Sequence, residues 1–132
     1  MAGRKTLAMT ERQFQALQTL WRRGPLTVRD FLEHFPAGTP YTTALALLQS
    51  MEKAGLVAAD KDGPAHRYRA VPTAEQATGE LLRDFARRFF GGSARQLAAG
   101  LVDAGELTPA DLDELEAKLK AKSNAKSRKG SR

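Results

Sequence analysis

The spacing of apolar residues changes from a helical to an alternating period after residue 55, and that change restricts the fold more than any other feature. Up to residue 55, apolar side chains recur at steps of three and four, which is the period of helices with one buried face. Over residues 65–71 they alternate, as in a strand with His66 and Tyr68 on one face and Arg67 and Arg69 on the other. The preceding Asp62-Gly63 pair is a hairpin turn signal. The pattern therefore predicts helices followed by a small β-hairpin.

Hydroxyl side chains indicate where the helices begin. Capping boxes or near variants, in which a hydroxyl residue precedes an Asp or Gln by three positions, start at Thr10, Thr27, Thr73 and Ser93. Thr39-Pro40 and Thr108-Pro109 add two starts with proline at the first helical position, where its missing N–H group does no harm. These signals predict six helices, over about residues 11–22, 28–35, 41–54, 74–90, 94–104 and 109–120.

Three helices followed by an arginine-bearing hairpin is the order of a winged helix-turn-helix. Such a module usually places its third helix in the major groove of DNA. We therefore expect a mainly α protein with a small β-hairpin, in which a winged helix-turn-helix precedes a helical dimerisation region. The expected parts are a flexible N-terminus over residues 1–9, a winged-helix domain over 10–72, a helical dimerisation region over 73–120 and a basic disordered tail over 121–132. The Lys, Ser and Gly content of the tail is typical of disorder.

The three C-terminal helices carry more apolar side chains than they can bury by themselves. A unit of about 48 residues leaves too much of its surface exposed to form its own core. A second copy of the chain is the simplest cover, although the helices could instead fold back on the winged-helix domain in a monomer. The residues expected to form the dimer contact are Leu81, Phe85, Phe89, Phe90, Leu97, Leu101, Leu112, Leu115 and Leu119.

The net charge of +6 is distributed unevenly along the 132 residues. Residues 1–71 have ten Lys/Arg against six Asp/Glu, residues 72–117 have four against nine, and residues 118–132 have seven against none. The acidic middle block is poorly suited to DNA phosphate, whereas the first block and the tail are suited to it. A charge run is also often no more than a solvated face.

The third predicted helix supplies the best candidates for reading DNA bases. Thr42 and Thr43 lie in its first turn, where hydroxyls and methyls can meet phosphate, base edges or a thymine methyl. Gln49 can pair with adenine, whereas Ala46 offers only an apolar contact. Because this helix presents no arginine, base readout should be modest, and the wing and dimer geometry should supply much of the affinity. The full set of DNA-binding candidates is Arg29, Thr39, Tyr41, Thr42, Thr43, Ala46, Gln49, Lys53, Arg67 and Arg69, each of which could instead be an ordinary solvated residue.

Four segments together resemble the penicillinase-repressor family over about residues 8–120. They are residues 16–30, which include Leu20-Trp21 and Gly24-Pro25-Leu26-Thr27, and residues 41–43, 51–57 and 88–93. The resemblance implies a homodimeric bacterial repressor that binds a palindromic operator through its winged helices. It also implies release from DNA when a membrane-bound sensor peptidase signals and the repressor is cut in its dimer region. The matching bond here is Gly100-Leu101.

Other classes of function are weaker or remain open. The chain has no cysteine and only two histidines, His34 and His66, without metal-ligand spacing, so we expect no enzyme activity, no metal and no cofactor. It has no apolar run that could span a bilayer, so we expect no membrane insertion and a cytoplasmic location. The alternatives are a nonspecific nucleoid-type protein dominated by the tail, a winged-helix protein that senses a small molecule, and a protein-interaction module.

Overall fold

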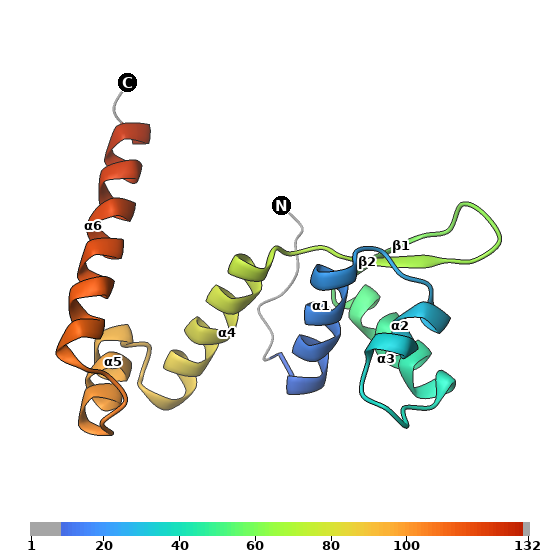
Figure 1. The fold of residues 1–132 in the computed structure, drawn as a ribbon, viewed down its shortest axis with the longest axis horizontal. Helices are drawn as coiled ribbons and strands as arrows, with labels where there is room; N and C mark the ends of the chain where they lie inside the picture. Colours follow the sequence, from blue (N-terminus) through green and yellow to red (C-terminus); the bar gives the residue numbers. More distant parts are fainter. Residues whose placement is uncertain (1–8, 131–132) are drawn as a thin grey trace.

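A computed structural model describes residues 9–130, which form helices and one two-stranded sheet (Figure 1). The helices are α1 (Glu11–Arg23), α2 (Val28–His34), α3 (Tyr41–Lys53), α4 (Ala74–Phe89), α5 (Ala94–Asp103) and α6 (Pro109–Gly130), and the strands are β1 (Val57–Asp60) and β2 (Arg67–Ala70). The fold is therefore mainly α with a small β-hairpin between α3 and α4, which confirms the class predicted from the sequence.

The helices begin where hydroxyl caps were expected, with one exception. Thr10 and Thr73 form complete capping boxes, while Thr27 and Ser93 accept a hydrogen bond from a backbone N–H group three residues on. The start of α3 is the exception, because Pro40 is its N-cap and makes no side-chain cap bond. The expectation that proline stands at the first position of this helix is thus wrong. A hydroxyl cap is absent here since the Thr39 hydroxyl donates backward, to the carbonyl oxygen of Pro36 at 2.8 Å.

The hairpin is antiparallel and is joined by a six-residue connection, residues 61–66, between its strands. Tyr68 lies in its ladder and is buried, whereas Arg67 and Arg69 are exposed, as the alternation predicted. His66 was expected on the face of Tyr68 but lies exposed just before β2, because the ladder begins only at Arg67. Tyr68 also exchanges two backbone hydrogen bonds with Leu26, of 3.0 and 2.8 Å, which fix the segment between α1 and α2 against the sheet.

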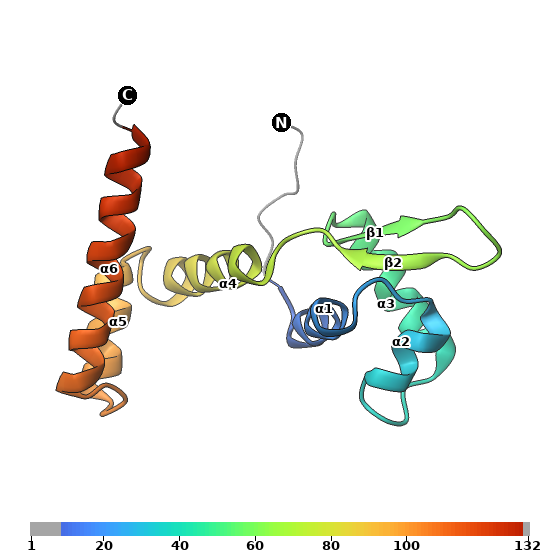
Figure 2. The ribbon, with the colours of Figure 1, turned by 45° about the horizontal axis from the view of Figure 1, so that its top comes forward.

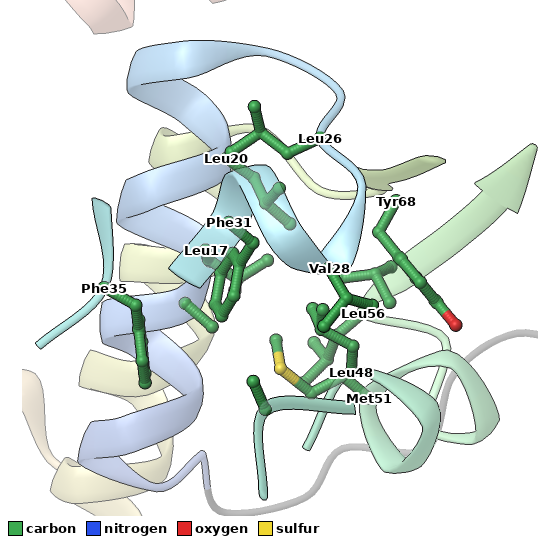
Figure 3. Packing of buried hydrophobic residues seen from close by; sticks show 14 residues of the cluster. Leu17, Leu20, Leu26, Val28, Phe31, Phe35, Leu48, Met51, Leu56 and Tyr68 are labelled. Carbon is green, nitrogen blue, oxygen red and sulfur yellow. The ribbon is translucent and has the colours of Figure 1, made fainter. Parts of the chain in front are cut away.

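One hydrophobic core lies between the first three helices and the sheet (Figure 3). Its largest fully buried side chains are Phe31, Leu17, Leu48, Met51 and Val57. They come from α1, α2, α3 and β1, and β2 adds the buried Tyr68, so each element of the winged helix contributes to one packed centre. Burying side chains of this size stabilises the fold by about 1.5–3 kcal/mol each.

The chain leaves this core along α4. Ala77 of α4 is buried against the core, and the indole N–H of Trp21 donates to the Pro72 carbonyl oxygen at 3.0 Å just before the helix. In both views α4 leads away from the winged helix, and α5 and α6 lie at the end opposite the hairpin (Figures 1 and 2). The structure thus separates a packed winged-helix end from an open helical end.

The last helix is longer than the sequence indicated. A disordered tail was expected from residue 121, but α6 continues to Gly130. Lysine and alanine are good helix formers, and no proline or glycine interrupts residues 110–129, so local propensity favours one continuous helix. At its start, a backbone hydrogen bond from Thr108 and a second from its hydroxyl lower the pKa of Asp111.

Candidate nucleic-acid interface

The outer face of α3 is the first part of the candidate site. Ala44, Leu48 and Met51 are buried and fix the helix on the core. The opposite face is open, and every DNA-contact candidate that the sequence placed on this helix is exposed there: Tyr41, Thr42, Thr43, Ala46, Gln49 and Lys53. This face offers hydroxyl, methyl and amide groups, which are the side-chain types that meet base edges in a major groove.

Two further candidates lie next to this face. Arg29 of α2 is exposed, and its guanidinium can reach solvent or a ligand. Thr39 is half-buried, and its hydroxyl is already hydrogen-bonded to the carbonyl oxygen of Pro36. Thr39 therefore has a structural role in the turn before α3, and it can offer DNA only its methyl group and the two lone pairs of its hydroxyl oxygen.

The hairpin of β1 and β2, called here the wing, carries the other two arginines of the candidate site. Arg69 pairs with Ala58 and Arg67 with Asp60 across the hairpin, and both arginine side chains are exposed. Tyr68 between them points inward, and its burial, followed by the charge of Glu52, raises the pKa of its hydroxyl. Glu52 of α3 is ion-paired with Lys61 of the wing connection at 3.5 Å. The wing is thus attached to the same helix that presents the threonines.

A groove of about 470 Å³ separates α3 from the wing. Its walls are the start of α2 with Arg29, the first turns of α3 with Tyr41, and the wing connection with Pro64 and His66. The sequence pattern indicated Arg29 and Tyr41 as DNA contacts but not His66. No sequence pattern indicates His66, because these residues are far apart in the chain. Only the packing of the wing beside α2 and α3 brings them to one groove.

The C-terminal helices expose a broad apolar surface in the single chain. Among the expected dimer residues, Phe89 is 64% exposed and Leu119 is 69% exposed. Phe85, Leu101, Leu112 and Leu115 are also exposed, whereas Leu81, Phe90 and Leu97 are half-buried. Phe85 contacts both neighbouring aromatic rings, with centroids 4.9 Å from Phe89 and 6.0 Å from Phe90. The surface formed by α4, α5 and α6 is called here the apolar C-terminal face.

The bond matched to the family's cleavage position lies inside α5. Gly100 is half-buried, and a Cβ atom built on it would lie 3.6 Å from Cε1 of Phe90, an ordinary van der Waals contact. Leu101, on the other side of the bond, is 40% exposed. A peptidase would therefore have to open or distort this helix before reaching the Gly100-Leu101 bond, because an extended strand is what protease active sites usually bind.

Two other kinds of site are absent from the described part of the chain. Residues 9–130 contain no group of three or more His, Cys, Asp or Glu side chains placed to hold a metal ion. Within the same range, no helix combines the length and hydrophobicity needed to cross a membrane.

Three helices on one core, an exposed third helix and an arginine-bearing hairpin define a winged helix-turn-helix protein of the DNA-binding class. Within this class, the chain belongs to the penicillinase repressor family, whose model matches residues 9–121. The family and the fold are those of DNA-binding transcriptional repressors, so the resemblance noted in the sequence is confirmed.

Solved structures also resemble this chain. One is a MarR family protein from Bacillus stearothermophilus, with 25% sequence identity and a TM-score of 0.47 over 86% of this chain and 77% of that chain. Another is the transcriptional regulator Tm0710 from Thermotoga maritima, with 17% identity and a TM-score of 0.46 over 86% of this chain and 78% of that chain. A search of curated proteins finds no match.

Proposed function

We propose that this protein is a sequence-specific repressor that binds a palindromic operator as a homodimer. The observation that carries the proposal is the exposed face of α3, with Thr42 and Thr43, beside a wing that exposes Arg67 and Arg69. The threonines contact base edges, and the arginines contact phosphates. Membership of the penicillinase repressor family supports a DNA-binding repressor.

The dimer part of the proposal is supported by the apolar C-terminal face. Exposed phenylalanines and leucines lie on all three helices, α4, α5 and α6, and large exposed apolar surfaces mark protein interfaces. A groove of about 880 Å³ lies between α4 and α6, and its lining includes Leu82, Lys118 and Lys122. A two-fold dimer presents two copies of α3, which explains why the operator should be palindromic.

Sequence-specific recognition of DNA is tested with genomic fragments that the purified protein selects at physiological salt. We expect enrichment of one inverted repeat. In binding assays on that operator and on random duplex, Arg69→Ala should weaken both about equally, by about threefold to tenfold, whereas Thr43→Ala should lower the preference for operator. Equal losses from both substitutions on both DNAs would falsify sequence-specific recognition by α3.

A truncation distinguishes sequence-specific binding by the winged helix from nonspecific binding by the basic C-terminal residues. Residues 122–132 lie beyond the family match and contain five Lys/Arg and no Asp/Glu. Their removal should reduce the salt dependence of binding but leave the preference for operator over random DNA intact. If the preference disappeared with them, the nucleoid-type alternative would replace the repressor.

We further propose that a sensor peptidase of the membrane inactivates the repressor by cutting Gly100-Leu101. Support comes from family membership and from the exposure of Leu101. Cutting here would separate the winged helix and α4 from α6, and thereby split the apolar C-terminal face. We expect fragments ending at Gly100 and beginning at Leu101 when the protein is co-expressed with its cognate peptidase, as mapped by mass spectrometry. An intact chain in derepressed cells would exclude cleavage as the inducing event.

A further inference from the structure

We propose that the groove between α3 and the wing holds a phosphodiester of the bound DNA, and that His66 and Arg29 are its contacts. Because imidazole gains a proton as the pH falls, this contact makes operator affinity rise in mild acid. The inference rests on the proposed DNA-binding function. It adds to that function a phosphate site in the groove, a contact by His66 and a dependence of affinity on pH.

The position of the groove indicates what fills it. With α3 in a major groove and the wing reaching toward the neighbouring minor groove, one sugar-phosphate strand must pass between the two elements. The space found there is the groove of about 470 Å³, which is bounded by Tyr41 of α3 and by Pro64 and His66 of the wing connection. Arg29 of α2 lines the same groove. A phosphate passing through it would therefore lie against an arginine and a histidine at once.

The charge of the groove favours an anion. The described residues that line it include Arg29 and His66 but no Asp or Glu. Arg29 and His66 are exposed, so their charged groups are not buried without a partner before DNA arrives. Pro64 and Ala65 of the same wall are apolar and suit the sugar rather than the phosphate. A basic pair beside an apolar wall matches a phosphodiester, which joins a charged phosphate to less polar sugars.

Two acidic groups of the neighbouring elements have other partners. Glu52 of α3, whose charge acts on Tyr68, is paired with Lys61. On β1, the carboxylate of Asp60 accepts a hydrogen bond from the backbone N–H of Asp62, and Asp30 of α2 does not line the groove. The other titratable side chains that line the groove together with His66 are Arg29 of α2, Tyr41 of α3 and Tyr68 of β2.

Of the side-chain types that line the groove, only histidine has an ordinary pKa near neutral pH. Arginine stays protonated throughout, a tyrosine hydroxyl titrates near pH 10, and burial raises the pKa of Tyr68 further. A neighbouring phosphate stabilises the charged form of an imidazole. Binding of DNA should therefore be accompanied by proton uptake at His66, and by linkage the affinity should be higher at lower pH.

The chain offers a matched control, because its second histidine lies outside the groove. His34 is exposed at the end of α2, as His66 is exposed on the wing, but His34 does not line the groove. Replacement of either by glutamine keeps a polar side chain of similar size and removes the imidazole. Since both positions are exposed, neither change should affect folding, which thermal denaturation of each variant can check.

The experiment measures the dissociation constant of the full-length protein for its operator at about pH 6 and about pH 8, at constant ionic strength. An exposed ion pair contributes roughly threefold in affinity, so a dimer with two grooves should bind roughly tenfold more tightly at the lower pH. His66→Gln should abolish this difference, and His34→Gln should keep it. At about pH 6, His66→Gln should also reduce the salt slope by about 0.9 for each half-site, as expected for the loss of one phosphate contact.

The outcomes separate this inference from the function on which it rests. Selective operator binding with the same pH dependence in wild type, His66→Gln and His34→Gln overturns the phosphate site but leaves the repressor in place. If the pH dependence is lost in His34→Gln instead, it originates at the end of α2, and the phosphate site at His66 is overturned as well. Absence of any operator preference in the wild type rejects the proposed function itself, independently of His66.

Discussion

Replacing Phe89 with glutamate is expected to convert the protein to monomers and to weaken operator binding by at least about a hundredfold. Phe89 is 64% exposed in the single chain and its ring packs at a tilt against Phe85, so it lies in the apolar C-terminal face and outside the winged-helix core. In a dimer its ring would be covered. Taking a carboxylate out of water in this apolar contact costs several kcal/mol, because the nearby Arg88 guanidinium, 5.8 Å from the Phe89 ring, is already paired with Asp84. The loss of the dimer leaves each α3 to bind a single half-site.

The control for this prediction adds the same charge to a position outside the apolar face. Ala117 of α6 is exposed and, at 100° per residue, lies on the side of the helix opposite Leu112, Leu115 and Leu119. Ala117→Glu should therefore remain dimeric and bind operator normally. Sedimentation equilibrium gives the oligomeric state, and fluorescence anisotropy with labelled operator gives the affinity. A dimeric Phe89→Glu variant with unchanged affinity would mean that other residues join the two copies.

The winged helix could be predicted from the sequence because the spacing of apolar residues within each helix and strand determines which face is buried. The step of three and four in α1, α2 and α3 places Leu17, Phe31 and Leu48 on the core side, and all three are buried. Likewise, the alternation in β2 correctly separates Tyr68 from its neighbouring arginines. In each case the side-chain period of the element itself decides which face is buried, so no knowledge of distant residues is needed.

The features that the sequence did not predict depend on distant partners or on competing local bonds. The bridge between Leu26 and Tyr68 joins segments more than 40 residues apart, and no periodicity indicates it. At the start of α3, the Thr39 hydroxyl bonds the preceding turn instead of capping the helix. His66 comes to the groove only because the wing packs beside α2 and α3. Composition suggested disorder after residue 120, whereas helix propensity continues α6 to Gly130.

The second large effect is expected in the core, at Phe31. Phe31 is fully buried on α2 and stacks on Phe35 with ring centroids 4.7 Å apart. Phe31→Ala removes this packing and leaves a cavity between the helices, which should lower the free energy of unfolding by about 3–5 kcal/mol. Since small domains are stable by about 5–15 kcal/mol in total, the winged helix would be close to unfolding at physiological temperature.

The comparison variant for the core is Leu32→Ala, at the half-buried neighbour on the same helix. Its loss should be smaller, about 1–2 kcal/mol, because the side chain gives up less buried surface and leaves less of a cavity. Urea denaturation of both variants at one fixed protein concentration measures the difference, since the stability of a dimer depends on concentration. A loss below about 1 kcal/mol for Phe31→Ala would mean that the helices close around the cavity. In that case α3 keeps its position through Leu48 and Met51, and operator binding should survive the substitution as well.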